Sequence, residues 1–135
     1  MPIAEITISV TDRRRIHELL LNEPARKLPA LALLKRKLEL AHVVEPEQMP
    51  DDIVTLNSQV RVLEASTDSE YGFTLVVPGL TMRPGDVSIL APVGAAAFGL
   101  KTGQEIFWYG SSGRRVGVRI LDIPYQPEAM GEYHL

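Results

Sequence analysis

A chain of 135 residues has the size of one domain, or of one domain with a small appendage, which excludes a large two-domain enzyme. Hydrophobic residues make up 45% and charged residues 23%, a globular composition that excludes disorder over the whole length. The net charge of -3 argues against a general or sequence-specific nucleic-acid binder, because phosphate affinity rests on clustered Lys and Arg. The chain has no Cys, so disulfides and thiolate chemistry are excluded.

The charges are divided unevenly along the chain. Residues 1–45 carry 8 Lys and Arg against 6 Asp and Glu, whereas residues 46–135 carry 6 against 11. Two parts with different surfaces are therefore expected. No basic stretch precedes an apolar run at the N-terminus, and nowhere do about 18 apolar residues occur together. We expect a cytoplasmic protein that does not contact membranes.

The first part, residues 1–46, predicts a strand and a short helical hairpin. Ile6, Ile8 and Val10 alternate with polar residues, as in a strand with one buried face. Thr11 and Asp12 offer a helix N-cap. The apolar residues that follow recur at helical spacing: Ile16, Leu19 and Leu20.

A second helix is predicted from Pro29 to about His42, because proline suits the first helical turn. Its apolar residues form a seam with three- and four-residue spacing: Leu31, Leu34, Leu38 and Ala41. Such a seam can pack against the first helix as a coiled-coil hairpin. Each helix has about 12 residues, so the hairpin extends roughly 18 Å.

Residues 43–52 contain two prolines and several acids, a composition typical of a linker, and we place a boundary between residues 46 and 47. The second part, residues 47–135, predicts short strands around Val60 and Phe73 and a buried strand at residues 88–93. Residues 94–100 are small and apolar, which favours a compact buried helix. Residues 105–109 and 114–123 predict a hairpin around a Gly-Ser-Ser-Gly turn.

Three separated motifs resemble the C-terminal domain of the Gre transcript-cleavage factors: MPDDIVTLNS at residues 49–58, SILAPVGAA at 88–96 and GLKTGQ at 99–104. The ending YQPEAMGEY at residues 125–133 narrows the resemblance to the family of regulators of nucleoside diphosphate kinase. The resemblance implies an α+β fold, with the coiled-coil hairpin mounted on an FKBP-like antiparallel sheet wrapped on a helix. It also implies a non-enzymatic transcription regulator that binds RNA polymerase at its secondary channel.

Gre factors promote transcript cleavage with paired carboxylates at the tip of a long coiled coil, which hold a metal ion. The segment between the two predicted helices supplies one carboxylate, Glu23, beside Arg26 and Lys27. A hard divalent ion prefers several oxygen ligands. We therefore expect a protein without metal or cofactor, which competes with Gre-type factors and does not stimulate cleavage. We also expect it to be a monomer.

Docking in the Gre family uses residues just before a shared proline, against the helical rim of the channel. Carried over by position, these residues are Ser88, Leu90 and Pro92. The family often has Asp or Asn where Leu90 stands, so an apolar contact must replace a polar one. A buried position in the strand is the alternative for Leu90.

An FKBP-like fold raises a second hypothesis, a prolyl isomerase or chaperone whose aromatic pocket is lined by Phe98, Trp108, Tyr109 and Tyr125. The other interpretation is that these aromatic residues form the core of a small sheet domain, because a fold does not confer an activity.

Three further patterns are weak signals of function. Residues 94–102 approach a phosphate-binding loop, but Leu100 displaces Lys101 from the required spacing. His17, His42 and His134 do not have the spacing of a helical metal site. Residues 13–15, three consecutive arginines, are typical of a solvated helix face, although they could favour approach to an acidic channel wall.

Overall fold

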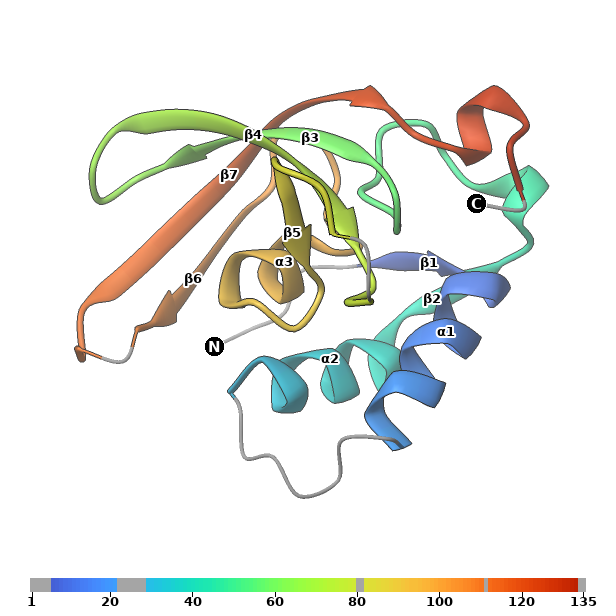
Figure 1. Ribbon diagram of the computed structural model, residues 1–135, viewed down its shortest axis with the longest axis horizontal. Coiled ribbons are helices and arrows are strands. Elements are labelled where there is room, and N and C mark those ends of the chain that lie inside the picture. Colours follow the sequence, from blue (N-terminus) through green and yellow to red (C-terminus); the bar gives the residue numbers. More distant parts are fainter. Residues whose placement is uncertain (1–5, 22–28, 80–81, 111, 134–135) are drawn as a thin grey trace.

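The computed structural model describes residues 6–21, 29–79, 82–110 and 112–133 (Figure 1). Its helices and strands, in chain order, are β1 (Thr7–Ser9), α1 (Val10–Leu21), α2 (Pro29–Leu40), β2 (His42–Val44), η1 (Pro46–Gln48), β3 (Gln59–Glu64), β4 (Ser69–Val76), β5 (Asp86–Ser88), α3 (Pro92–Ala97), β6 (Glu105–Tyr109), β7 (Arg115–Tyr125) and η2 (Glu128–Met130). The α+β class predicted from the sequence is confirmed.

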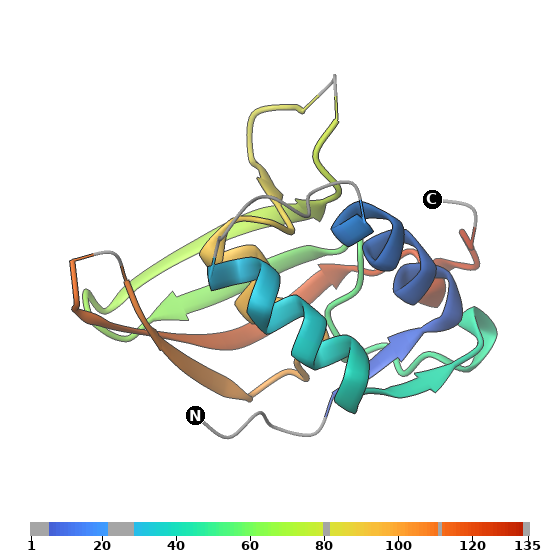
Figure 2. The same cartoon turned by 90° about the horizontal axis from the view of Figure 1, so that it is seen from below.

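Two sheets and three α-helices make up the described molecule. The larger sheet has the strand order β5-β4-β3-β7-β6, and β1 and β2 form a second, parallel pair. Helix α3 contacts β5, β6 and β7 on one side and α2 on the other, so it lies between the large sheet and the hairpin (Figures 1 and 2). The predicted antiparallel sheet holds for β3–β4, β3–β7 and β6–β7 but is wrong for β4 and β5, which run parallel.

The chain turns directly from β1 into α1. Ile6 and Ile8 are buried as predicted, but Val10 is 42% exposed because it already belongs to the helix. The N-cap is Ser9, whose Oγ accepts a hydrogen bond of 3.0 Å from the backbone N–H of Asp12, so the prediction of a Thr11-Asp12 cap was wrong. Asp12 is thereby free to point inward, where its Oδ2 accepts a hydrogen bond from the N–H of Leu56 at 3.0 Å.

Part of the predicted linker is a strand. Residues His42–Val44 pair with Thr7–Ser9 as β2, and α2 ends at Leu40 rather than near His42. After β2 the first proline of the predicted linker ends the strand and begins a short 3-10 helix at Pro46–Gln48. The β1–β2 pair therefore brings both ends of the helical hairpin together.

Helix α2 is fastened to the body through Lys37, whose side chain is completely buried. Its ammonium donates hydrogen bonds to the carbonyl oxygens of Ala95 at 2.8 Å, Ala96 at 2.7 Å and Phe98 at 2.6 Å. These carbonyls lie at the C-terminal end of α3, where a helix leaves acceptors without intrahelical partners. Burial lowers the pKa of Lys37 to about 7, and the three acceptors oppose that shift by favouring the protonated form.

The predicted strand at residues 88–93 is wrong beyond its first residue. Strand β5 ends at Ser88, and α3 begins at Pro92 rather than at Gly94. Proline at the first helical position explains the early start, because its fixed φ is helical and its missing N–H would have no intrahelical partner there. Residues 94–97 are all buried, which confirms a compact helix of small residues.

A single cluster of buried side chains draws on both sides of the predicted boundary at residues 46 and 47. From the first part it contains Ile8, Ile16 and Leu34, together with side chains of the large sheet and of α3. The division into residues 1–46 and 47–135 stays a prediction. The structure shows that these two parts share one hydrophobic core. None of the described helices is long and apolar enough to span a membrane.

Replacing Lys37 should destabilise the fold far more than replacing a neighbouring lysine. Lys37→Ala leaves the carbonyls of Ala95 and Ala96 without their side-chain donor and opens a cavity, so the free energy of unfolding should fall by about 2–4 kcal/mol. The matched control Lys35→Ala, at an exposed position of the same helix, should change it by less than about 0.5 kcal/mol. Urea denaturation measures both, and equal losses would contradict the role given to Lys37.

Stability should depend on pH through Asp12. Burial is the main reason that the pKa of Asp12 is raised from 3.8 to about 7. The hydrogen bond from Leu56 and the charge of Arg15 lower this pKa, whereas the charge of Glu128 raises it further. A raised pKa contributes stability that is fully present below about pH 3.8 and is lost as pH rises through about 7.

The near-isosteric variant Asp12→Asn removes this titration. Between pH 4 and 7 the wild type should lose stability relative to the variant, by at most about 1.4 kcal/mol per pH unit. Urea denaturation of both proteins across this range gives the difference. A difference in free energy of unfolding between the two proteins that does not vary with pH would contradict the raised pKa of Asp12.

Candidate functional site

The turn that joins β5 to α3 holds the three residues predicted to dock on a partner. Ser88 organises it, because its Oγ accepts a hydrogen bond from the N–H of Leu90 and its carbonyl accepts one from the N–H of Ala91, both at 3.0 Å. The buried Ile89 anchors the turn through its N–H, which donates to the carbonyl of Val76 at 2.8 Å. The backbone of the turn is thus fixed to the large sheet.

The turn presents an apolar surface. Pro92 is exposed at the first position of α3, and Leu90 is half-buried, with part of its side chain packed against the core. Leu90 therefore satisfies neither sequence interpretation completely, because it contributes to the core and also remains partly accessible. Ser88 is half-buried and its Oγ is engaged within the turn.

Gly94 sets how closely α3 approaches this turn. A Cβ at position 94 would lie 2.2 Å from the carbonyl oxygen of Ser88 and 3.1 Å from Cδ1 of Leu75. Only glycine fits this position without a shift of the backbone. The same packing leaves no room for a phosphate at residues 94–97, and the Nζ of Lys101 lies 3.8 Å from Oδ2 of Asp52, so the loop is not arranged for nucleotide binding.

The loop before β5, at the opposite end of this strand from the turn, has an ordered charged stretch that sequence reasoning missed. The carboxylate of Asp86 accepts a hydrogen bond of 2.8 Å from the N–H of Arg83, and the N–H of Asp86 donates to the carbonyl of Arg83 at 3.0 Å. Arg83 is exposed and Met82 is 45% exposed. Figure 2 shows the described part of this yellow loop projecting from the body. The only sequence signal was the Pro-Gly pair at residues 84–85, which predicts a turn.

The predicted hairpin-tip residues Glu23, Arg26 and Lys27 lie outside the described residues, as does His134. His17 is exposed on α1, and His42 is exposed on β2 rather than on a helix. Within residues 6–21, 29–79, 82–110 and 112–133, no three His, Cys, Asp or Glu side chains group as metal ligands would.

The four aromatic residues of the prolyl isomerase hypothesis do not converge. Trp108 of β6 pairs with Val116 near the start of β7, whereas Tyr125 is the last residue of β7, nine residues further on, which is roughly 30 Å along a strand. Tyr109 is 74% exposed, whereas Phe98 is buried in the core. The structure therefore provides no aromatic pocket made of these residues.

Lys37 and Asp12 are the two buried charged residues that the sequence analysis overlooked. Lys37 stands among the apolar seam residues of α2, between Leu34 and Leu38, and a charged residue at such a position could have indicated a buried role. Asp12 resembles an ordinary N-terminal helix residue, so its contact with Leu56 had no local signal.

Comparison with known proteins shows which class of protein has this fold. Residues 49–125 match the family described as transcription elongation factor, GreA/GreB, C-terminal. The solved structure of a prokaryotic transcription elongation factor GreA/GreB from Nitrosomonas europaea has a TM-score of 0.71 at 38% identity, covering 90% of this chain and 100% of that one. A Gre-like transcription regulator is the class that the fold and the family match define.

A relative that is matched over nearly its whole length narrows this class to one family. The regulator of nucleoside diphosphate kinase of Escherichia coli (strain K12) is 39% identical over 132 residues, or 96% of each chain. GreA of Thermodesulfovibrio yellowstonii is 34% identical over 74 residues, or 54% of this chain and 47% of that protein. The chain belongs to the family of regulators of nucleoside diphosphate kinase, which confirms the resemblance stated from the motifs. The proteins named in these matches are regulators and elongation factors rather than enzymes.

Adding a methyl group at Gly94 should disturb the docking turn. Gly94→Ala forces Ser88 and α3 apart and should lower the free energy of unfolding by about 1–3 kcal/mol. Gly79→Ala is the matched control, because nothing lies within 4 Å of its added Cβ, and it should be neutral or slightly stabilising. Thermal and urea denaturation compare the two variants, and equal stability would refute the close contact.

Proposed function

We propose that the chain regulates transcription by binding RNA polymerase at its secondary channel, where it competes with Gre-type factors and does not stimulate transcript cleavage. One observation carries this proposal: the match to the GreA/GreB C-terminal family spans residues 49–125 and so contains the complete β5–α3 turn. The chain acts in this proposal as a monomer.

The proposed contact with polymerase is apolar. Exposed Pro92 and the accessible part of Leu90 supply it, while Ser88 keeps the backbone of the turn in place through its two accepted hydrogen bonds. Because the turn is fixed before binding, docking requires little ordering of the backbone.

The helical hairpin in this proposal occupies the channel entrance without supplying catalysis. Helices α1 and α2 have 12 residues each, so each spans roughly 18 Å. The segment that joins them contributes Glu23 as its only carboxylate, beside two cations. A single carboxylate gives a divalent ion too few ligands, which supports occupation without transcript cleavage.

The hairpin and the docking turn are linked by direct contacts. Lys37 of α2 binds the end of α3, and Gly94 near the start of α3 packs on Ser88 of the turn. Docking of the turn therefore also orients the hairpin. The prolyl isomerase alternative has no comparable support, since Trp108 of β6 pairs near the start of β7 and Tyr125 is the last residue of β7.

Competition with a Gre factor tests the proposal directly. Fluorescently labelled GreA bound to core RNA polymerase should be displaced by an excess of this protein, and transcript cleavage by a stalled complex should fall as displacement proceeds. The protein alone should leave cleavage at the rate of polymerase without a factor. Failure to displace GreA at saturating concentration, or stimulation of cleavage, would contradict the proposal.

The docking surface can be tested with Pro92→Asp. Aspartate is acceptable at the first position of a helix, so the fold should remain, whereas the apolar contact is lost. The affinity for polymerase should fall by about tenfold or more. Met130→Asp is the control and should bind within about twofold of wild type, because Met130 is 66% exposed and belongs to η2, the red segment that lies away from α3 in Figure 1. Equal binding by both variants would place docking elsewhere.

A further inference from the structure

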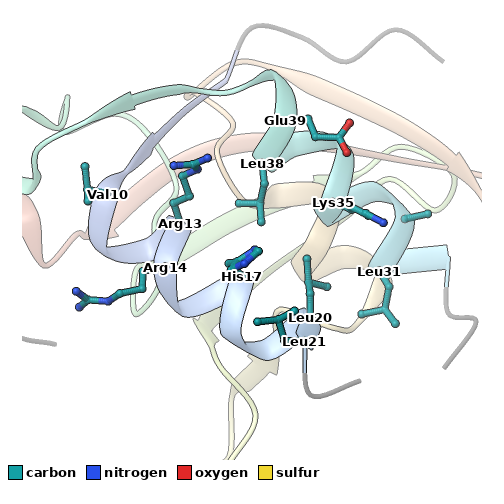
Figure 3. A pocket seen from close by; sticks show the side chains of 11 residues that line it. Val10, Arg13, Arg14, His17, Leu20, Leu21, Leu31, Lys35, Leu38 and Glu39 are labelled. Atoms are coloured by element: carbon teal, nitrogen blue, oxygen red, sulfur yellow. The ribbon is translucent and has the colours of Figure 1, made fainter. Parts of the chain in front are cut away.

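A groove of about 820 Å³ runs between α1 and α2 (Figure 3). The residues that line it come from both helices: Val10, Arg13, Arg14, His17, Leu20, Leu21, Leu31, Ala32, Lys35, Leu38 and Glu39. Leu20 and Leu38 also pack against the core, whereas the fully buried Asp12, Ile16 and Lys37 do not line the groove. The groove is therefore the open side of the hairpin, opposite the side chains that are fully buried against the body.

The floor of the groove is apolar. Leu20, Leu31 and Leu38 are half-buried, and Figure 3 shows Leu20 and Leu38 between the two helices. At its ends, Val10 is 42% exposed and Leu21 is 63% exposed. Large exposed apolar side chains gathered in one concave surface are typical of an interaction site.

The rim of the groove is basic. Arg13, Arg14 and Lys35 are exposed lining residues, and Glu39 is the one acid in the lining. Figure 3 shows His17 between the helices and the Arg14 side chain directed away from α2. The chain as a whole has a net charge of -3, so this concentration of cations runs against its average. An apolar floor with a basic rim is complementary to a ligand that is apolar on one face and acidic beside it.

We propose that this groove binds an acidic, amphipathic helix of a partner protein. The lining residues of α1 run from Val10 to Leu21, roughly 16 Å, which suits about three turns of a helix lying along the groove. Leucine-sized side chains of the partner fill the floor, and its Glu or Asp residues meet Arg13, Arg14 and Lys35. This contact is separate from docking at Pro92 and stands whether or not the partner is polymerase.

A membrane surface is the other ligand that basic and apolar residues together can attract. The shape of the surface argues against it, because the apolar side chains line a concavity between two helices. Insertion into a bilayer requires an apolar face that projects outward, and aromatic residues often strengthen it. The lining residues include no Trp, Tyr or Phe.

Binding of a designed peptide tests the proposal. The probe is a fluorescein-labelled helical peptide of about 14 residues, with Leu at i, i+3, i+4 and i+7, Glu beside this stripe and Ala elsewhere, measured by fluorescence anisotropy at low salt. The double variant Arg14→Glu, Lys35→Glu should weaken binding by about tenfold. Leu21→Ser should weaken it by about fivefold, since it removes apolar contact at one end.

Matched controls lie on the same helix α2 outside the groove. Arg36→Glu and Leu40→Ser change an exposed charge and an exposed leucine, and both should bind within about twofold of wild type. Circular dichroism confirms that each variant is folded. A peptide of the same composition with a scrambled order should bind at least about tenfold more weakly.

Five results would overturn the proposal. The designed peptide could fail to bind, or the scrambled peptide could bind equally well. Arg36→Glu could weaken binding as much as the double variant, which would show charge attraction without a site. Phosphatidylglycerol vesicles could bind the protein where the peptide does not, which would assign the groove to a membrane surface. Self-association abolished by Arg14→Glu, without peptide binding, would assign it to a second copy.

Discussion

A buried ammonium group holds the two halves of this molecule in one arrangement. The carbonyls of Ala95 and Ala96 close to the end of α3 lack intrahelical partners, since the N–H of Gly99 donates instead to Val54. Lys37 satisfies both and adds a third bond to the carbonyl of Phe98. A neutral amine could donate only two hydrogen bonds and would turn its lone pair towards the third carbonyl, so this geometry requires the charged form. The negative end of the α3 dipole stabilises that charge.

The position of the docking turn follows from this interaction. Lys37 fixes α2 on one side of α3, and the absence of a side chain at Gly94 lets the other side of α3 reach the carbonyl of Ser88. Asp12 adds a second connection, from α1 to the backbone of Leu56. The helical hairpin and the surface around Pro92 are therefore held in one relative arrangement.

The sequence predicted the elements whose signals are local. The alternation around Val60 and Phe73, the hairpin at Gly110 and Gly113, and the helix that begins near Pro29 all depend on neighbouring residues, and the structure has them. The family was also accessible, because its motifs are contiguous. Strand β2 was missed because its partner, β1, is more than 30 residues away and its own three residues carry little pattern.

The site was less predictable because its determinants connect distant segments. Lys37 meets its carbonyl acceptors about 60 residues along the chain, and Asp12 meets Leu56 at a separation of 44. The strand predicted at residues 88–93 failed for a local reason, since Pro92 was counted with an apolar run instead of as the first residue of a helix. The groove on the hairpin depends on how α1 and α2 pack, which the seam residues alone did not determine.

The central claim is that the hairpin has one fixed orientation on the body, and an interspin distance tests it directly. The chain has no Cys, so Arg36→Cys on α2 and Arg119→Cys on β7 place two spin labels at exposed positions without further changes. Double electron–electron resonance should give one narrow distance distribution centred on the separation seen in the structure. A broad distribution, or one with two maxima, would show a hairpin that moves independently and would contradict the account.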